Sequence, residues 1–192
     1  MKWLMKIFLA LLFVMPVQAW AASDERGGFR DLYWGESLES VQKTRDVEDI
    51  DANSDTNISH YWVNLTKDEP HVLAGIPIRG DRFIVTFWKN QLLAVVIPFS
   101  DENSNFWSMK NALTHLHGQP YHDESIPWVT STIEGMSRSG DMNYDGGAYF
   151  WIDKTTCYAL LHYVEQDKMF FVMLVPIAQM EKMSNEQDAL GW

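Results

Sequence analysis

The sequence predicts an α+β domain in which an antiparallel sheet carries two helices packed on one face. Three observations predict it: most apolar runs have the length of a strand, short polar turns join neighbouring runs, and only two stretches have helical periodicity. The expected order of elements is β-α-β-β-β-α-β-β-β. Few helices and many hairpin connections are typical of this class, so we expect a single domain over residues 29–180.

The domain is predicted to begin with a short strand at Phe29–Trp34, which Gly35 ends. Ser37 is a good N-cap for a short helix because its hydroxyl can accept a backbone N–H. Glu39 suits the first turn of that helix, where the helix dipole favours an acid. The acidic stretch at 46–60 predicts an exposed connection or a ragged edge of the sheet.

Three strands are predicted in the middle of the chain, at 60–65, 82–88 and 92–99. Only Lys89-Asn90-Gln91 separates the last two, and this spacing predicts a β-hairpin. The run Leu92–Phe99 is almost entirely apolar, which predicts a central strand covered on both faces.

The second helix is marked by apolar residues that recur along one helix face. These residues are Phe106, Met109, Leu113 and Leu116. Asn103 or Ser104 is expected to cap its first turn, and Gly118 and Pro120 mark its end. Strand character then returns at 131–137 and in three further runs, at 148–153, 155–164 and 168–177. Residues 181–192 form a polar tail.

Residues 1–21 have the features of a secretory signal peptide, and 22–28 are predicted to be a flexible lead. Its parts are a basic start, an apolar run and a small-residue cleavage site: Lys2 and Lys6, Ile7–Val14, and Ala19-Trp20-Ala21 with Val17-Gln18-Ala19 as an alternative. The apolar run is shorter than the roughly 20 residues of a membrane span. The mature chain is therefore expected to be soluble, without a membrane span, and periplasmic or secreted.

The chain is acidic, with a formal net charge of −11 at pH 7. Loss of the signal segment removes two lysines and no acid, so the expected mature charge is −11 − 2 = −13. Nucleic acid repels such a chain, which argues against nucleic-acid binding, whereas a basic partner or a cation fits it better. The single cysteine, Cys157, cannot form an internal disulfide, and its apolar surroundings in the sequence predict a buried thiol.

Three short motifs resemble those of a group of small secreted bacterial α+β proteins. The segment Phe29-Arg30-Asp31-Leu32-Tyr33-Trp34-Gly35-Glu36-Ser37 resembles their F-[RK]-x-x-x-W-G-x-[ST] opening. Phe87–Leu92 and Leu113–Pro120 resemble their later strand-pair and helix-end motifs. The resemblance covers most of the chain after the signal, and its motifs imply structural rather than catalytic roles.

The expected fold also resembles that of the BamE/SmpA group of envelope proteins, and more distantly that of beta-lactamase-inhibitor proteins. The BamE/SmpA proteins are lipoproteins, whereas this chain has no cysteine near its predicted cleavage site. The resemblance therefore implies a place in the envelope without a lipid anchor. It implies no catalytic residue.

The stretch DMNYDGG has two interpretations. Asp141, Asn143, Asp145 and Gly146 match the first half of a calcium loop. Ile152 stands where that loop needs its last acid, and both flanks predict strands rather than helices, which argues against an EF-hand. A hairpin turn is the favoured interpretation, and a weak calcium site is the alternative.

Other metal and nucleophile patterns are incomplete. His115, His117 and His122 are close in sequence, but residues two apart on a helix point in different directions, and no further ligands occur at zinc-site spacing. They are interpreted as exposed histidines at a helix end. Ser137 fails as a nucleophile-elbow serine because Ser139 replaces the required glycine.

Four tryptophans are candidates to line a groove for a peptide, a sugar or a hydrophobic partner. They are Trp88, Trp107, Trp128 and Trp151. The favoured alternative is that these rings pack in the core and at its margins.

The leading hypothesis is a soluble, non-enzymatic, periplasmic or secreted protein that binds another envelope protein. It follows from the signal segment, the α+β pattern, the lack of catalytic and cofactor motifs and the envelope-protein resemblance. One alternative is a small-molecule or weak calcium-binding module. Another is a hydrolase whose active-site residues are scattered along the sequence.

Overall fold

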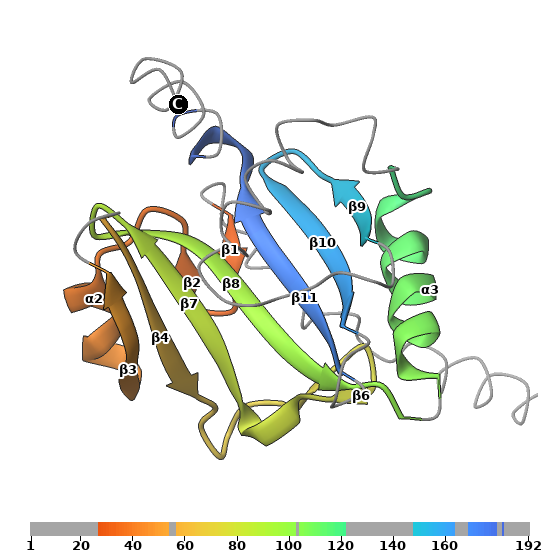
Figure 1. Cartoon of the computed structure of the whole chain (residues 1–192), viewed down its shortest axis with the longest axis horizontal. Coiled ribbons are helices and arrows are strands. Elements are labelled where there is room, and N and C mark those ends of the chain that lie inside the picture. Colours follow the sequence, from red (N-terminus) through yellow and green to blue (C-terminus); the bar gives the residue numbers. More distant parts are fainter. Residues whose placement is uncertain are drawn as a thin grey trace, which may run out of the picture.

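Seven antiparallel strands form one sheet in the computed structural model, which describes residues 27–53, 57–102, 104–121, 148–163, 169–179 and 182. The strands are β3 (Val47–Asn53), β4 (Ile58–Asn64), β7 (Arg82–Trp88), β8 (Gln91–Ser100), β9 (Ala148–Ile152), β10 (Thr156–Tyr163) and β11 (Met169–Pro176). Their order across the sheet is β3-β4-β7-β8-β11-β10-β9, so β3 and β9 are its edges (Figure 1). The prediction of an α+β domain with an antiparallel sheet is confirmed.

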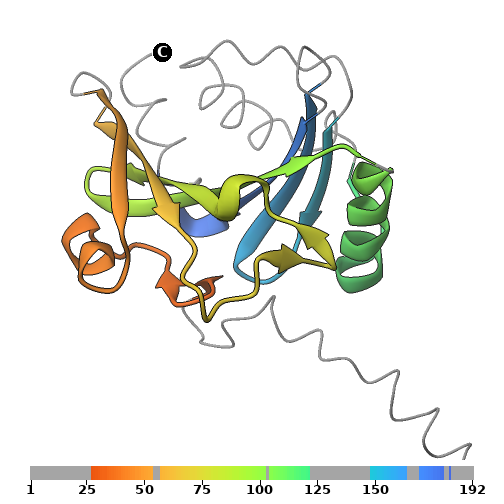
Figure 2. The ribbon, with the colours of Figure 1, turned by 90° about the horizontal axis from the view of Figure 1, so that it is seen from below.

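Helices α2 and α3 and two small hairpins lie on the same side of the sheet (Figure 2). These elements are α2 (Leu38–Thr44), α3 (Asn105–His117), β1 (Gly28–Phe29) with β2 (Leu32–Tyr33), and β5 (Val72–Leu73) with β6 (Ile76–Pro77), followed by the short 3-10 helix η1 (Arg79–Asp81). Val41 of α2 and Phe106, Met109 and Leu113 of α3 join one buried cluster with the sheet. This shared cluster fixes both helices against one face.

The opening motif of the domain attaches α2 to the sheet. The N–H of Gly35 donates to the carbonyl of Leu92 at 3.0 Å, and the N–H of Leu92 donates to the carbonyl of Glu36 at 2.8 Å. Gly35 has a φ of 80°, which favours glycine. The indole N–H of Trp34 donates to the hydroxyl of Thr156 at 3.1 Å. The motif therefore ties the start of α2 to β8 and β10.

The two helices are capped differently. Ser37 caps α2 as predicted, because its hydroxyl accepts the N–H of Ser40 at 3.3 Å. Ser104 is the N-cap residue of α3, but its side chain makes no capping hydrogen bond. The carboxylate of Asp101 accepts the N–H of Phe106 at 3.2 Å instead. Helix α3 ends before Gly118, as predicted.

The first half of the domain differs from the prediction in three details. The strand expected at 29–34 is the hairpin of β1 and β2, because Arg30 adopts a positive φ and reverses the chain. The acidic stretch 46–60 contains the edge strand β3 and the start of β4. The hairpin of β5 and β6 was not predicted, since each of its strands has only two residues. The strand expected at 131–137 lies outside the described residues.

The central strands separate two buried clusters. Leu93, Ala159 and Met173 belong to the cluster on the face opposite the helices, while Leu92, Leu160 and Val172 belong to the helix-side cluster. Successive residues of a strand point to opposite faces. The prediction that Leu92–Phe99 is covered on both faces is therefore confirmed, because all eight residues are buried.

A buried arginine joins the loops beneath α2. Arg45 is only 8% exposed, and its guanidinium donates to the carboxylates of Asp31 and Glu69. Arg30 also donates to Glu69, at 2.9 Å. Burial by itself raises the pKa of Glu69, but hydrogen bonds from Arg45, Thr66 and Arg30 outweigh it and lower the pKa to about 2. These charged groups join the chain segments that precede β3 to the loop between β4 and β5.

Candidate functional site

The structure does not bring the candidate tryptophans together. Trp151 is 0% exposed, and its indole N–H donates to the carbonyl of Gly118 at 3.1 Å. Trp88 is 7% exposed and packs in the cluster on the opposite face. Trp107, on α3, is 54% exposed. Trp128 lies outside the described residues, so the described tryptophans alone do not line a common groove.

The metal candidates give no site within the described ranges. Asp141, Asn143 and Asp145 all lie outside those ranges, as does His122. His117 stacks on Tyr158, with ring centroids 4.2 Å apart. No group of three or more His, Cys, Asp and Glu side chains in the described part of the chain is arranged to hold a metal ion.

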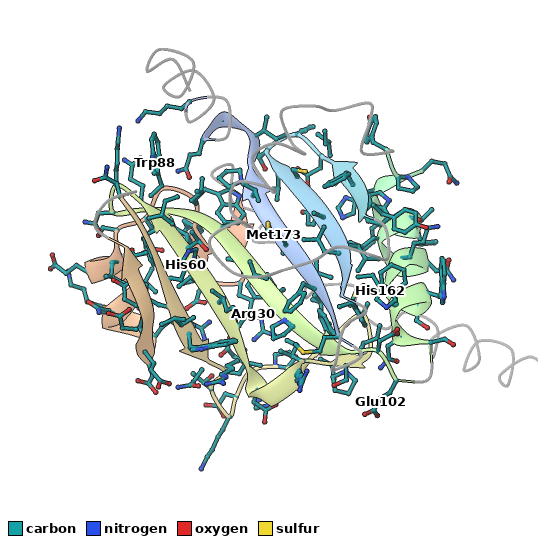
Figure 3. All side chains as sticks on the ribbon, in the orientation of Figure 1. Arg30, His60, Trp88, Glu102, His162 and Met173 are labelled. Carbon is teal, nitrogen blue, oxygen red and sulfur yellow. The ribbon has the colours of Figure 1, made fainter. Side chains whose placement is uncertain are left out.

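A histidine–carboxylate pair lies at the amino end of α3. His162 Nε2 is 3.0 Å from Asp101 Oδ2, and both side chains are mostly buried. Phe106 stacks on the His162 ring with centroids 4.5 Å apart, and the other Asp101 oxygen accepts the Phe106 N–H. Figure 3 shows His162 at the end of the sheet away from Trp88. The pair therefore joins the start of α3 to β10.

This pair has the histidine and carboxylate of a hydrolase site, but no nucleophile in the described ranges completes it. A histidine held by a carboxylate can act as a general base when a nucleophile or water lies within hydrogen-bond reach. In the described ranges, His162 hydrogen-bonds only to Asp101, and no hydroxyl or thiol joins it. The carboxylate also caps α3, which is a sufficient structural reason for the pair.

An aromatic patch follows along the outer side of α3. The Lys110 ammonium lies 3.8 Å from the centroid of the Tyr149 ring and 5.1 Å from that of Trp107. Each distance is within the range of a cation–π contact. The exposed Trp107 side chain therefore lies next to a lysine that also contacts the Tyr149 ring.

The edge strand β3 presents a different surface. Its register with β4 is interrupted by a bulge between Asp49 and Asp51, which leaves Ile50 as the extra residue. Ile50 is 43% exposed, and Glu48 and Asp49 are exposed beside it. No described strand pairs with the outer side of β3. The surface therefore combines an open backbone, carboxylates and one apolar side chain.

Two ionisable groups of β10 are poorly suited to proton transfer. Burial raises the pKa of the Cys157 thiol to about 12, so the thiol stays protonated at neutral pH. Burial also raises the pKa of Tyr158, whose hydroxyl donates to Asp153 Oδ2 at 2.9 Å. Asp153 also accepts the N–H groups of Thr155 and Thr156, both at 2.9 Å. This cluster fixes the turn between β9 and β10.

Comparison of the chain with protein-family models, with curated proteins and with solved structures found no match. The resemblance to the BamE/SmpA group therefore stays a prediction. Within the described ranges, none of the helices has the length and apolar character that crossing a membrane requires.

Two features of the structure were not predicted from the sequence: the edge strand β3 and the pairing of Asp101 with His162. The strand β3 was not predicted as a strand because its acidic residues are typical of loops. The β-branched residues Val47 and Ile50 were the only local signal that favours a strand there. The pairing of Asp101 with His162 joins residues 61 apart, and no spacing rule predicts it. Asp101 follows β8 and His162 lies in β10, and these two strands come close to α3 because β11 alone separates them in the sheet.

Proposed function

We propose that this protein is a soluble, non-enzymatic, periplasmic or secreted protein that binds another protein of the cell envelope. The observation that carries the proposal is the outer edge of β3, which has no partner strand within the described ranges. The signal-like residues 1–21 and the BamE/SmpA resemblance support the envelope location. Protein binding is thus the function that the geometry supports best.

An open sheet edge supports protein binding for a physical reason. Each edge strand presents backbone N–H and C=O groups that can pair with a strand from another chain. At β3 this edge is seven residues long, which is longer than a mean strand. In the part of the chain that the structure describes, β3 is the last strand at its end of the sheet and lies next to α2 (Figure 1).

The chemistry of the described residues supports a non-enzymatic protein. The thiol of Cys157 and the phenol of Tyr158 are buried with raised pKa values, and the Asp101–His162 pair caps a helix. Each group thus has a structural reason for its position. Protein binding requires only a stable sheet and an accessible surface, and no reactive group.

Affinity capture followed by a direct binding measurement tests the proposal. The immobilised mature protein is incubated with native envelope extract, and any retained protein is purified and titrated by calorimetry. We expect saturable binding of one envelope protein at a fixed stoichiometry. Turnover of an envelope substrate that His162→Ala abolishes would replace the proposal with a hydrolase, and the absence of any saturable partner would also contradict it.

A further inference from the structure

We propose that the outer edge of β3 binds an extended, lysine- or arginine-bearing segment of a partner protein as an added antiparallel strand. This inference rests on the proposed function, because it names the surface and the partner chemistry for protein binding. It is carried by the backbone geometry, the charge and the exposed apolar side chain of β3.

The backbone of β3 directs alternate residues outward. The N–H of Asn64 donates to the carbonyl of Asp46 at 3.3 Å, so this pair is hydrogen-bonded across β3 and β4. Hydrogen bonding alternates along an antiparallel pair. Val47 and Asp49 therefore direct their N–H and C=O groups away from β4, toward the open edge. A partner strand would pair with these two residues.

The side chains of this edge select a basic partner. Glu48 and Asp49 are exposed, and the stretch that contains them has no basic residue between Asp46 and Asn53. Opposite charges on paired strands attract, whereas like charges directly opposite each other destabilise the pair. The net charge of −11 extends the attraction for a basic segment beyond the contact itself.

The same charges disfavour a second copy of this chain. An antiparallel pair of two β3 strands would bring the carboxylates of Glu48 and Asp49 in one copy close to those in the other. Acidic residues at sheet edges commonly prevent such self-pairing. A basic segment paired with β3 avoids this repulsion. We therefore infer that the edge binds a basic segment rather than a second copy of β3.

Ile50 adds an apolar contact at the bulge. Its side chain is 43% exposed, although isoleucine is more often buried. The bulge at this residue interrupts the regular pairing, so the added strand is expected to be short and to end near Ile50. The predicted partner segment therefore alternates basic residues with apolar residues.

Peptide binding to the full mature protein tests the inference. The probe is a short fluorescent peptide that alternates lysine and valine, and its binding is followed by anisotropy. One control peptide has glutamate in place of lysine. A second keeps the lysines and replaces the valines with proline, so it has the same charge but cannot form a strand. We expect only the lysine–valine peptide to bind.

Three variants locate the binding. Asp49→Pro removes an outward N–H while leaving the pairing with β4 intact, and we expect it to weaken binding roughly three- to tenfold. The double variant Glu48→Lys and Asp49→Lys is expected to weaken binding about tenfold by repulsion. Glu39→Lys reverses one charge at an exposed position on α2, away from the edge, and should alter binding less than about twofold. Circular dichroism confirms that each variant is folded.

The outcomes separate this inference from the proposed function. Equal binding of the two lysine peptides, or unchanged binding by both β3 variants, overturns the added strand. A dimer of the free protein that Asp49→Pro dissociates overturns it in favour of a second copy. If a purified envelope partner binds wild type and both β3 variants equally, the inference fails while the proposed function stands. If no partner binds wild type, the proposed function fails.

Discussion

The sheet has β9 at one edge and β3 at the other (Figure 1). At β9 it ends against packed aromatic side chains, whereas at β3 it ends on exposed carboxylates. The backbone of Phe150 in β9 exchanges hydrogen bonds with Tyr121, at 2.7 and 3.4 Å, and Trp151 is fully buried beneath α3. No described backbone group pairs with the outer side of β3. One edge is therefore closed by packing, and the other is kept apart from like strands by charge. This difference makes β3 the edge suited to a partner.

The largest predicted effect concerns the packed edge. Trp151→Ala should lower the free energy of unfolding by about 3–5 kcal/mol, because it leaves a cavity between β9 and α3. Urea denaturation measures this loss. The matched control is Trp107→Ala, whose exposed ring should cost less than about 1 kcal/mol. Equal losses in the two variants would contradict the difference in burial.

The next effect concerns the charged groups beside β3. Arg45→Met should cost about 2 kcal/mol, because it leaves the carboxylates of Asp31 and Glu69 without their buried partner, although Asp31 is half exposed and hydrated. Lys43→Met, at the exposed end of α2, is the control and should be nearly neutral. Urea denaturation again measures both. A smaller loss for Arg45→Met than for Lys43→Met would refute the role assigned to the arginine.

The pH dependence of stability reports on the same group. The pKa of Glu69 is lowered from 4.5 to about 2 in the folded chain, so its charge stabilises the fold above pH 4.5. That contribution should be lost as the pH falls from 4.5 to about 2. The stability difference between wild type and Glu69→Gln should shrink across this window. A difference that stays constant down to the lower limit would show that Glu69 does not titrate as proposed.

A smaller effect is predicted where α3 begins, next to the packed edge. Asp101→Ala should cost about 1 kcal/mol, because its carboxylate accepts the Phe106 N–H in place of the Ser104 side chain. Ser104→Ala is the matched control and should cost much less, since its side chain makes no capping bond. Thermal denaturation would rank the two, and the reverse order would contradict this assignment.

The smallest effect on stability is predicted at the open edge. Replacing Glu48 and Asp49 by valine should change the free energy of unfolding by less than about 0.5 kcal/mol, since both side chains are exposed. Removal of the carboxylates should instead allow self-pairing of β3, seen as concentration-dependent association in sedimentation velocity. A variant that stays monomeric at high concentration would show that charge does not keep the edges apart.

The sequence predicted the parts of the fold that depend on local patterns. The period of Phe106, Met109 and Leu113 was enough for α3, and the apolar run Leu92–Phe99 was enough for a strand buried on both faces. The strand β3 was harder, because its formation depends on pairing with β4 rather than on its own acidic composition. Edge position is a property of the whole sheet.

The candidate surfaces were less predictable than the fold. Trp88, Trp107 and Trp151 look equivalent in the sequence, but the strand alternation sends Trp88 and Trp151 to opposite faces and the helix turns Trp107 outward. Their separation depends on register, which composition does not contain. The acidity of 46–53 was visible, whereas its place at an open edge was not.

Hydrogen exchange at β3 tests the central claim most directly. The amides of Val47 and Asp49 should exchange rapidly in the free protein, while that of Glu48, which faces β4, should be protected. The lysine–valine peptide should slow exchange at Val47 and Asp49 by more than about tenfold and leave the amides of β9 unchanged. Exchange at Val47 and Asp49 that is unaffected by saturating peptide would contradict the account.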